Sequence, residues 1–300
     1  MPTQAARPQQ LVGRVFRGST VVRQGLLTSK QVRSSAWRRL GQDVYADAAL
    51  PVTHRVLVNA VGLSLPPGAG FAGRSAAVLW GVDDAADADD PVDVVLPRGV
   101  RWNAGAGVRR RALGPTQRLE RVGRWSCTGR ADTAVDMVRW LPLDDGVVLL
   151  DRLIAGGMTS LDDVREAAEH LPRCQGSARA REAARLADGR AESPQETRLR
   201  QVLQRGGLPE PVPQFRVFDA TGFVARVDVG HPDLRMAVEY DGLWHGERRA
   251  FLADRRRLDR LVEAGWVVLH VTLEDLRHPE RLVARVRAMR AHRTTRTEAR

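Results

Sequence analysis

Residues 226–245 read RVDVGHPDLRMAVEYDGLWH, and this stretch decides how the C-terminal part of the chain folds. Two strand-like runs flank the segment HPDL, which has the composition of a turn, so the pattern predicts a β-hairpin. With Asp233 and Leu234 at the turn of an antiparallel ladder, Asp228 lies opposite Glu239. The apolar residues then share the other face of the hairpin, and they are Val227, Val229, Val238 and Tyr240.

The same register gathers acidic side chains on one face and places Arg226 opposite Asp241. Like charges that face each other destabilise a sheet, so the repulsion between Asp228 and Glu239 must be offset. A divalent cation would do this, because Mg²⁺ binds one or two carboxylates and completes its shell with water and phosphate oxygens. The hairpin therefore predicts a metal site with Asp228 and Glu239 as ligands of Mg²⁺, or of Mn²⁺ in its place. The alternative is a solvent-exposed face on which these acids are surface residues and Arg226 pairs with one of them.

Three further residues are candidates for catalysis beside this pair. Asp241 follows the second strand, and His245 has the pKa range of a general acid or base, although a histidine in a loop is more often a surface residue. Glu196 ends the segment Ser193-Pro194-Gln195-Glu196, whose spacing is that of a helix capping box. It either caps a helix or adds a carboxylate to the site, and the sequence leaves both open.

Arginines surround the hairpin in the sequence and are candidates for binding phosphate. Arg226 lies on the first strand, while Arg256 and Arg257 belong to an arginine-rich helix expected over about 247–264. The alternative is that they form the solvated face of that helix. A second basic run, Arg109 to Arg111, is expected to protect a sheet edge from aggregation rather than to bind a ligand.

Composition indicates a folded chain with a polyanionic partner. Its 300 residues are 43% hydrophobic, enough for two domains, and its net charge is +11. This charge makes a polyanion such as nucleic acid the expected partner. No segment has the roughly 18 apolar residues of a membrane span, so the expectation is a cytoplasmic protein that binds no membrane. Cys127 and Cys174 are expected to be buried thiols.

Element patterns divide the chain into four parts. A short helical, winged-helix-like segment is expected over 1–50, with Lys30, Arg33, Arg38 and Arg39 near a phosphate backbone or merely solvated. An α+β to helical middle region follows over 51–190. Residues 191–292 predict the order helix, three strands, helix, strand, helix, and a basic tail over 293–300 is expected to be disordered. The predicted fold class is therefore α/β, with an α+β region preceding the C-terminal domain.

The C-terminal domain resembles the domain of unknown function 559, a relative of the very-short-patch-repair endonucleases in the PD-(D/E)xK restriction-endonuclease-like superfamily. The motifs that carry the resemblance are SPQETRLRQVL, ARVDVGHPDLRMAVEYDGLWH and DRRRLDRLVEAGWVVLHVT, in this order. It implies an αβββαβ core with a mixed sheet. It also implies that Asp228 and Glu239 bind metal, that Glu196 lies beside them, and that His245 matches a histidine of the repair enzymes. Asp241 stands where the superfamily usually has lysine, which leaves its role between metal ligand and base.

The first 190 residues resemble, more loosely, the N-terminal part of AbiEi-like antitoxins through GLLTSKQV, WRRLGQDVYA, GRSAAVLWGV and ADTAVDMVRWL. Together the resemblances imply a metal-dependent endonuclease that hydrolyses phosphodiester bonds in DNA, in repair or defence. The alternative they imply is a non-catalytic DNA-binding regulator of the antitoxin type that keeps the nuclease fold as a scaffold. A third reading is a C-terminal domain that mediates protein contacts.

Overall fold

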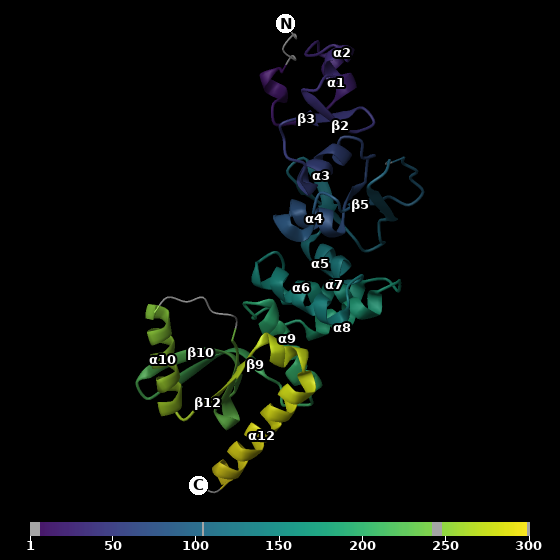
Figure 1. Cartoon of the computed structure of the whole chain (residues 1–300). Coiled ribbons are helices and arrows are strands. Elements are labelled where there is room, and N and C mark those ends of the chain that lie inside the picture. Colours follow the sequence, from purple (N-terminus) through teal and green to yellow (C-terminus); the bar gives the residue numbers. More distant parts are fainter. Residues whose placement is uncertain (1–6, 104, 242–247, 299–300) are drawn as a thin grey trace. The chain divides into compact units, whose positions relative to one another are not determined.

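A computed structural model describes residues 7–103, 105–241 and 248–298 (Figure 1). The chain forms two compact units. The N-terminal unit comprises Met1–Leu141 with Met158–Arg181, and the C-terminal unit comprises Pro142–Gly157 with Glu182–Arg300. Each unit is described by itself below.

The N-terminal unit begins with a small sheet of strand order β1-β3-β2. Its elements are β1 (Val15–Arg17), α1 (Gly18–Arg23), α2 (Ser29–Val32), β2 (Trp37–Gly41) and β3 (Val44–Asp47). Thr28 caps α2, because its side chain accepts from the Gln31 N–H while the Gln31 side chain accepts from the Thr28 N–H. Two short helices precede the β2–β3 hairpin, and the winged-helix-like character of 1–50 stays a prediction.

A five-stranded sheet follows, with strand order β6-β5-β4-β8-β7. Its elements are α3 (His54–Gly62), β4 (Gly70–Phe71), α4 (Gly73–Leu79), β5 (Val92–Leu96), β6 (Val108–Ala112), β7 (Leu119–Val122) and β8 (Trp125–Thr128). Every residue of β5 is buried, as expected for an inner strand with apolar side chains on both faces. The sheet therefore has β6 and β7 as its two edges.

The middle of the chain is helical, as its 3.6-residue pattern predicts. Its helices are α5 (Arg130–Val138), α6 (Leu143–Ala155), α7 (Leu161–His170) and α8 (Ser177–Leu186). Ser160 is the N-cap of α7, and its hydroxyl accepts from the Asp163 N–H at 3.1 Å. Cys174 is exposed, contrary to the expectation, because it lies in the loop between α7 and α8, whereas Cys127 is fully buried.

The C-terminal unit has the predicted order of elements. They are α9 (Pro194–Arg205), β9 (Val212–Asp219), β10 (Gly222–His231), β11 (Met236–Tyr240), α10 (Arg248–Glu263), β12 (Val267–Val271), α11 (Leu273–Arg277) and α12 (Pro279–Glu298). The sheet order is β12-β11-β10-β9; β12 runs parallel to β11, and the other pairs are antiparallel. The predicted α/β fold with a mixed sheet is confirmed.

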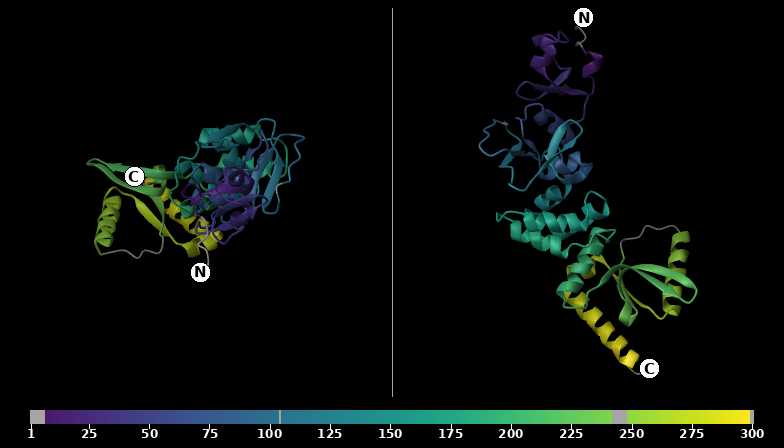
Figure 2. Two further views of the ribbon diagram at one scale, coloured as in Figure 1. Left: turned by 90° about the horizontal axis from the view of Figure 1, so that it is seen from above. Right: turned by 180° about the vertical axis from the view of Figure 1, so that it is seen from behind.

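Helices cover both faces of this sheet (Figures 1 and 2). On one face, Leu199 and Leu203 of α9 and Leu282 of α12 pack with Val229 and Val238. On the other face, residues of α10 pack with strand residues, among them Leu261, Trp266, Val217, Val227 and Ala237. The described part of α12 continues through Glu298, so 293–298 is helical where a disordered tail was expected. Arg293 explains the extension, since its guanidinium donates to the carbonyls of Leu234 and Gly265.

The β10–β11 hairpin has the predicted register. Val229 pairs with Val238, and a short 3₁₀ turn of Pro232–Leu234 joins the strands. One detail of the prediction is wrong: Val227 packs on the α10 face, while Val229 and Val238 pack on the α9 face. We attribute this to Gln214 on β9, which stands opposite Asp228 with φ +52° and disturbs the regular alternation there.

Among the described residues, no helix is both long and apolar enough to cross a membrane.

Candidate carboxylate site

Asp228 is held by a hydrogen bond that breaks the regular ladder between β10 and β11. Its Oδ2 atom accepts from the Tyr240 N–H at 2.8 Å. The regular pairing of β10 with β11 ends at Val229 and Val238, one step before Asp228 and Glu239. The Asp228 carboxylate thus takes the acceptor place that a strand carbonyl would otherwise fill, and the two strands open at the acidic pair.

The environment of Asp228 makes its carboxylate form unfavourable. The pKa of Asp228 is raised from 3.8 to about 6, first by burial and then by the negative charges of Glu196 and Glu239. The Tyr240 N–H and the Arg257 charge oppose this shift. The negative charges of Glu196 on α9 and Glu239 on β11 therefore act on Asp228 of β10. Burial together with these two charges makes ionisation of Asp228 less favourable than that of a free aspartate.

Glu239 is the most buried of the three carboxylates and has a cationic partner of its own. It is 6% exposed, and Arg257 of α10 donates from Nη1 to Oε1 at 2.6 Å and from Nη2 to Oε2 at 2.8 Å. This two-fold geometry is the strongest form of a guanidinium–carboxylate pair. Arg257, a candidate for phosphate binding, thus lies at the site but binds a carboxylate in this state.

Of the two roles that the sequence leaves open for Glu196, its side chain does not complete the capping box. The Ser193 hydroxyl accepts from the Glu196 N–H at 3.2 Å, so Ser193 caps α9 as predicted. The Glu196 side chain does not return to the Ser193 amide. Its Oε2 atom instead accepts from the Glu192 N–H at 2.9 Å and from the Gln214 side chain at 2.7 Å. These two hydrogen bonds hold the Glu196 carboxylate in place, so it does not serve as a capping group for Ser193.

Gln214 is a site residue that sequence reasoning missed. It carries a left-handed φ of +52°, which costs a residue with a side chain of order 1–3 kcal/mol and is concentrated at functional sites. Its side-chain amide donates to Glu196. No signal in the sequence singles out this glutamine, because only the pairing of β9 with β10 brings it beside Asp228.

The remaining candidates lie at the margin of the cluster or outside the described residues. Asp241 is exposed at the end of β11, where its N–H donates to the Val271 carbonyl. Arg226 pairs with Glu192 at 2.7 Å rather than with Asp241, since β10 and β11 have already separated at that point. Arg256 is exposed on α10. His245 falls in 242–247, outside the described residues.

The donor set of the cluster fits a hard divalent cation in its chemistry. Asp228 and Glu239 offer only oxygen, and Mg²⁺ is commonly held by one or two carboxylates together with waters and phosphate. In the described part of the chain, no group of three His, Cys, Asp or Glu side chains is arranged to hold a metal ion. At this site Arg257 engages both oxygens of Glu239. A cation here would have to share Glu239 with Arg257 or displace it.

Two curated proteins of Mycobacterium tuberculosis are similar to this chain, one from strain CDC 1551 / Oshkosh and one from strain ATCC 25618 / H37Rv. Each is 33% identical over 216 residues, which is 71% of this chain and 78% of the relative. The chain belongs to their family. Both members are described as uncharacterized, so the family brings no activity with it. No family model and no solved structure matches the chain.

Proposed function

We propose that this protein is a metal-dependent endonuclease that hydrolyses phosphodiester bonds in DNA, in repair or defence, and that it acts in the cytoplasm. The observation that carries the proposal is the partly buried Asp228, whose pKa is raised to about 6 by burial and by the negative charges of Glu196 and Glu239. Such a cluster is costly unless a ligand compensates it, and perturbed carboxylates of this kind concentrate at active sites. The net charge of +11 and the resemblance to repair endonucleases support the same conclusion.

Each residue has a role in the proposal. Asp228 and Glu239 would hold Mg²⁺ or Mn²⁺, and Glu196 would add negative charge. When bound, the ion would polarise the phosphodiester and lower the pKa of a bound water. Asp241 or His245 accepts or delivers the proton, and Arg226 and Arg256 bind backbone phosphates. Arg257 leaves Glu239 and pairs with a substrate phosphate instead. This exchange keeps Arg257 ion-paired and frees the Glu239 carboxylate.

The test compares the protein with an Asp228→Asn variant on plasmid, mismatched duplex and single-stranded DNA, with Mg²⁺, Mn²⁺ or EDTA. Asn keeps the acceptor for the Tyr240 N–H but removes the charge, so cleavage should fall at least 100-fold while the fold remains. Asp233→Asn, in the exposed turn of the same hairpin, is the matched control and should cleave normally. Calorimetric binding of Mn²⁺ should likewise disappear only in Asp228→Asn. Equal cleavage by both variants, or no metal-dependent cleavage of any tested DNA or RNA, contradicts the proposal.

One observation favours a second function, that of a non-catalytic DNA-binding regulator on a nuclease scaffold. The two-fold pair with Arg257 already compensates the charge of Glu239. A regulator would bind DNA in a salt-dependent manner, without cleavage and without any effect of Asp228→Asn.

A further inference from the structure

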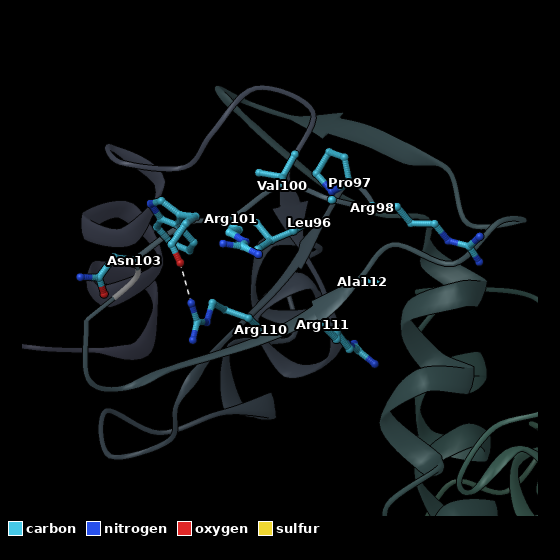
Figure 3. Close-up of a pocket in the computed structure, with 11 residues that line it drawn as sticks. Leu96, Pro97, Arg98, Val100, Arg101, Asn103, Arg110, Arg111 and Ala112 are labelled. Carbon is cyan, nitrogen blue, oxygen red and sulfur yellow. Dashed lines mark hydrogen bonds between the residues drawn. The ribbon is translucent and has the colours of Figure 1, made fainter.

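A basic groove lies in the N-terminal unit, along the edge strand β6 and the loop that follows β5. It has a volume of about 710 Å³ and is lined by residues 96–103 and 110–112 (Figure 3). The lining contains four arginines and no aspartate or glutamate. Because β6 is the terminal strand of the sheet, one side of the groove is open.

Two arginines of β6 are neutralised by buried acids. Arg109, outside the lining, donates to Asp93 at 2.6 Å, and Arg111 forms an ion pair with Asp136. Burial lowers the pKa of Arg111 to about 10. Two of the three arginines in the basic run of β6, which the sequence assigns to protection of the edge, are therefore paired with buried acids. The uncompensated charge of the groove comes from the third and from the preceding loop.

That charge comes from Arg98 and Arg101 of the loop together with Arg110 of β6. Within the described residues, neither Arg98 nor Arg101 makes a hydrogen bond or ion pair, and both are exposed. Arg110 donates to the Trp102 carbonyl at 2.5 Å, a neutral acceptor that orients the guanidinium and leaves its charge intact. Figure 3 shows Arg98 extending away from Arg101 and Arg110, so the three charges are spread along the groove.

We propose that this groove binds the phosphate backbone of a nucleic acid. Guanidinium groups recognise phosphate oxygens through paired donors, and backbone contacts of this kind position a protein on its substrate. Charges that are spread over two segments suit a chain of phosphates better than a single phosphate ion. The absence of carboxylates from the lining removes the like-charge repulsion that would oppose such a ligand. The groove needs no metal and lies in a different unit from the carboxylate site.

The experiment measures binding of a short DNA duplex to the full chain by fluorescence anisotropy in EDTA, over a series of NaCl concentrations. The test variant is Arg101→Gln with Arg110→Gln. The control is Arg118→Gln with Arg121→Gln, which removes the same charge from exposed positions at the β7 edge of the same sheet. Loss of two phosphate contacts should make the slope of log K against log salt shallower by about 1.8 and weaken binding roughly 60-fold at 0.1 M salt. The control should change neither quantity in this way.

A single Arg101→Gln variant leaves the Arg110–Trp102 contact intact and serves as a second test. For this variant the slope of log K against log salt should change by about 0.9. Equal effects in test and control variants overturn the proposal, as does unchanged binding in both. An acidic protein segment added along β6 is the competing occupant. The proposal would be overturned in favour of this acidic segment if poly-glutamate bound in a manner that depends on Arg101 and Arg110 while duplex binding did not. Because EDTA prevents metal-dependent cleavage, failure here leaves the endonuclease proposal untouched, and the converse also holds.

Discussion

Asp228 is partly buried between Glu196 and Glu239, and this surrounding makes its ionisation unfavourable. Its pKa of about 6 in the folded protein lies above the ordinary value of 3.8. A carboxyl group with a raised pKa binds its proton more tightly in the folded state than in the unfolded state. The free energy of unfolding therefore falls as pH rises from about 4 to 6 and stays lower above that range.

This sign predicts that Asp228→Asn stabilises the metal-free protein at neutral pH. In EDTA above pH 6, the free energy of unfolding of the variant should exceed that of the parent by about 1 to 3 kcal/mol. This range allows for solvent screening of a partly exposed group. The difference should vanish below about pH 3, where Asp228 of the parent is protonated in both the folded and the unfolded state. Urea unfolding at several pH values measures it, and a difference that is independent of pH would contradict the assigned cause.

The two cysteines differ in the exposure of their thiols. Burial raises the pKa of Cys127 to about 12, and its side chain is 0% exposed, whereas Cys174 is exposed. Since the thiolate is the reactive form, a thiol reagent should modify one cysteine in the native protein and two after unfolding. Cys174→Ser should abolish the native reaction. Modification of Cys127 in the folded protein would count against the buried position of β8.

At the scale of elements, α6 and α9 are joined by a buried polar network centred on Asp151. Its Oδ2 atom accepts from Thr197 at 2.8 Å and from Arg200 at 2.7 Å, and its Oδ1 atom accepts from the backbone N–H of Asp188 at 2.8 Å. Asp151 and Arg200 are 1% and 3% exposed. The network fixes the helix that carries Glu196 at its N-terminal end, and nothing in the separate sequence patterns of α6 and α9 predicts it.

Removal of one partner from this network should leave a buried charge uncompensated. Asp151→Ala is expected to lower the free energy of unfolding by about 3–5 kcal/mol. Asp145→Ala provides a matched comparison, because it breaks a pair between the same two helices in which both side chains are exposed, and it should cost less than about 1 kcal/mol. Denaturant titration of both variants decides, and equal losses would contradict the role given to burial.

At the scale of the whole molecule, the chain contains two compact units. Multi-domain proteins commonly depart from two-state unfolding, so we expect each unit to unfold in a transition of its own. Calorimetry should therefore resolve two thermal transitions, and Asp151→Ala should lower the midpoint of only one of them. A single transition that moves as a whole would show instead that the units unfold together.

The sequence by itself determined the local elements of the candidate site. The alternation in 226–241 predicted the hairpin and its register, and Ser193 with Pro194 predicted the start of α9, because short-range sterics and hydrogen bonding set these features. Only the tertiary structure decided what surrounds Asp228 and Glu239. The pair between Arg257 and Glu239, the position of Glu196 and the left-handed Gln214 all depend on how α9, α10 and β9 pack on the sheet. Packing joins residues that are distant in sequence, and local patterns carry no record of which of them will meet.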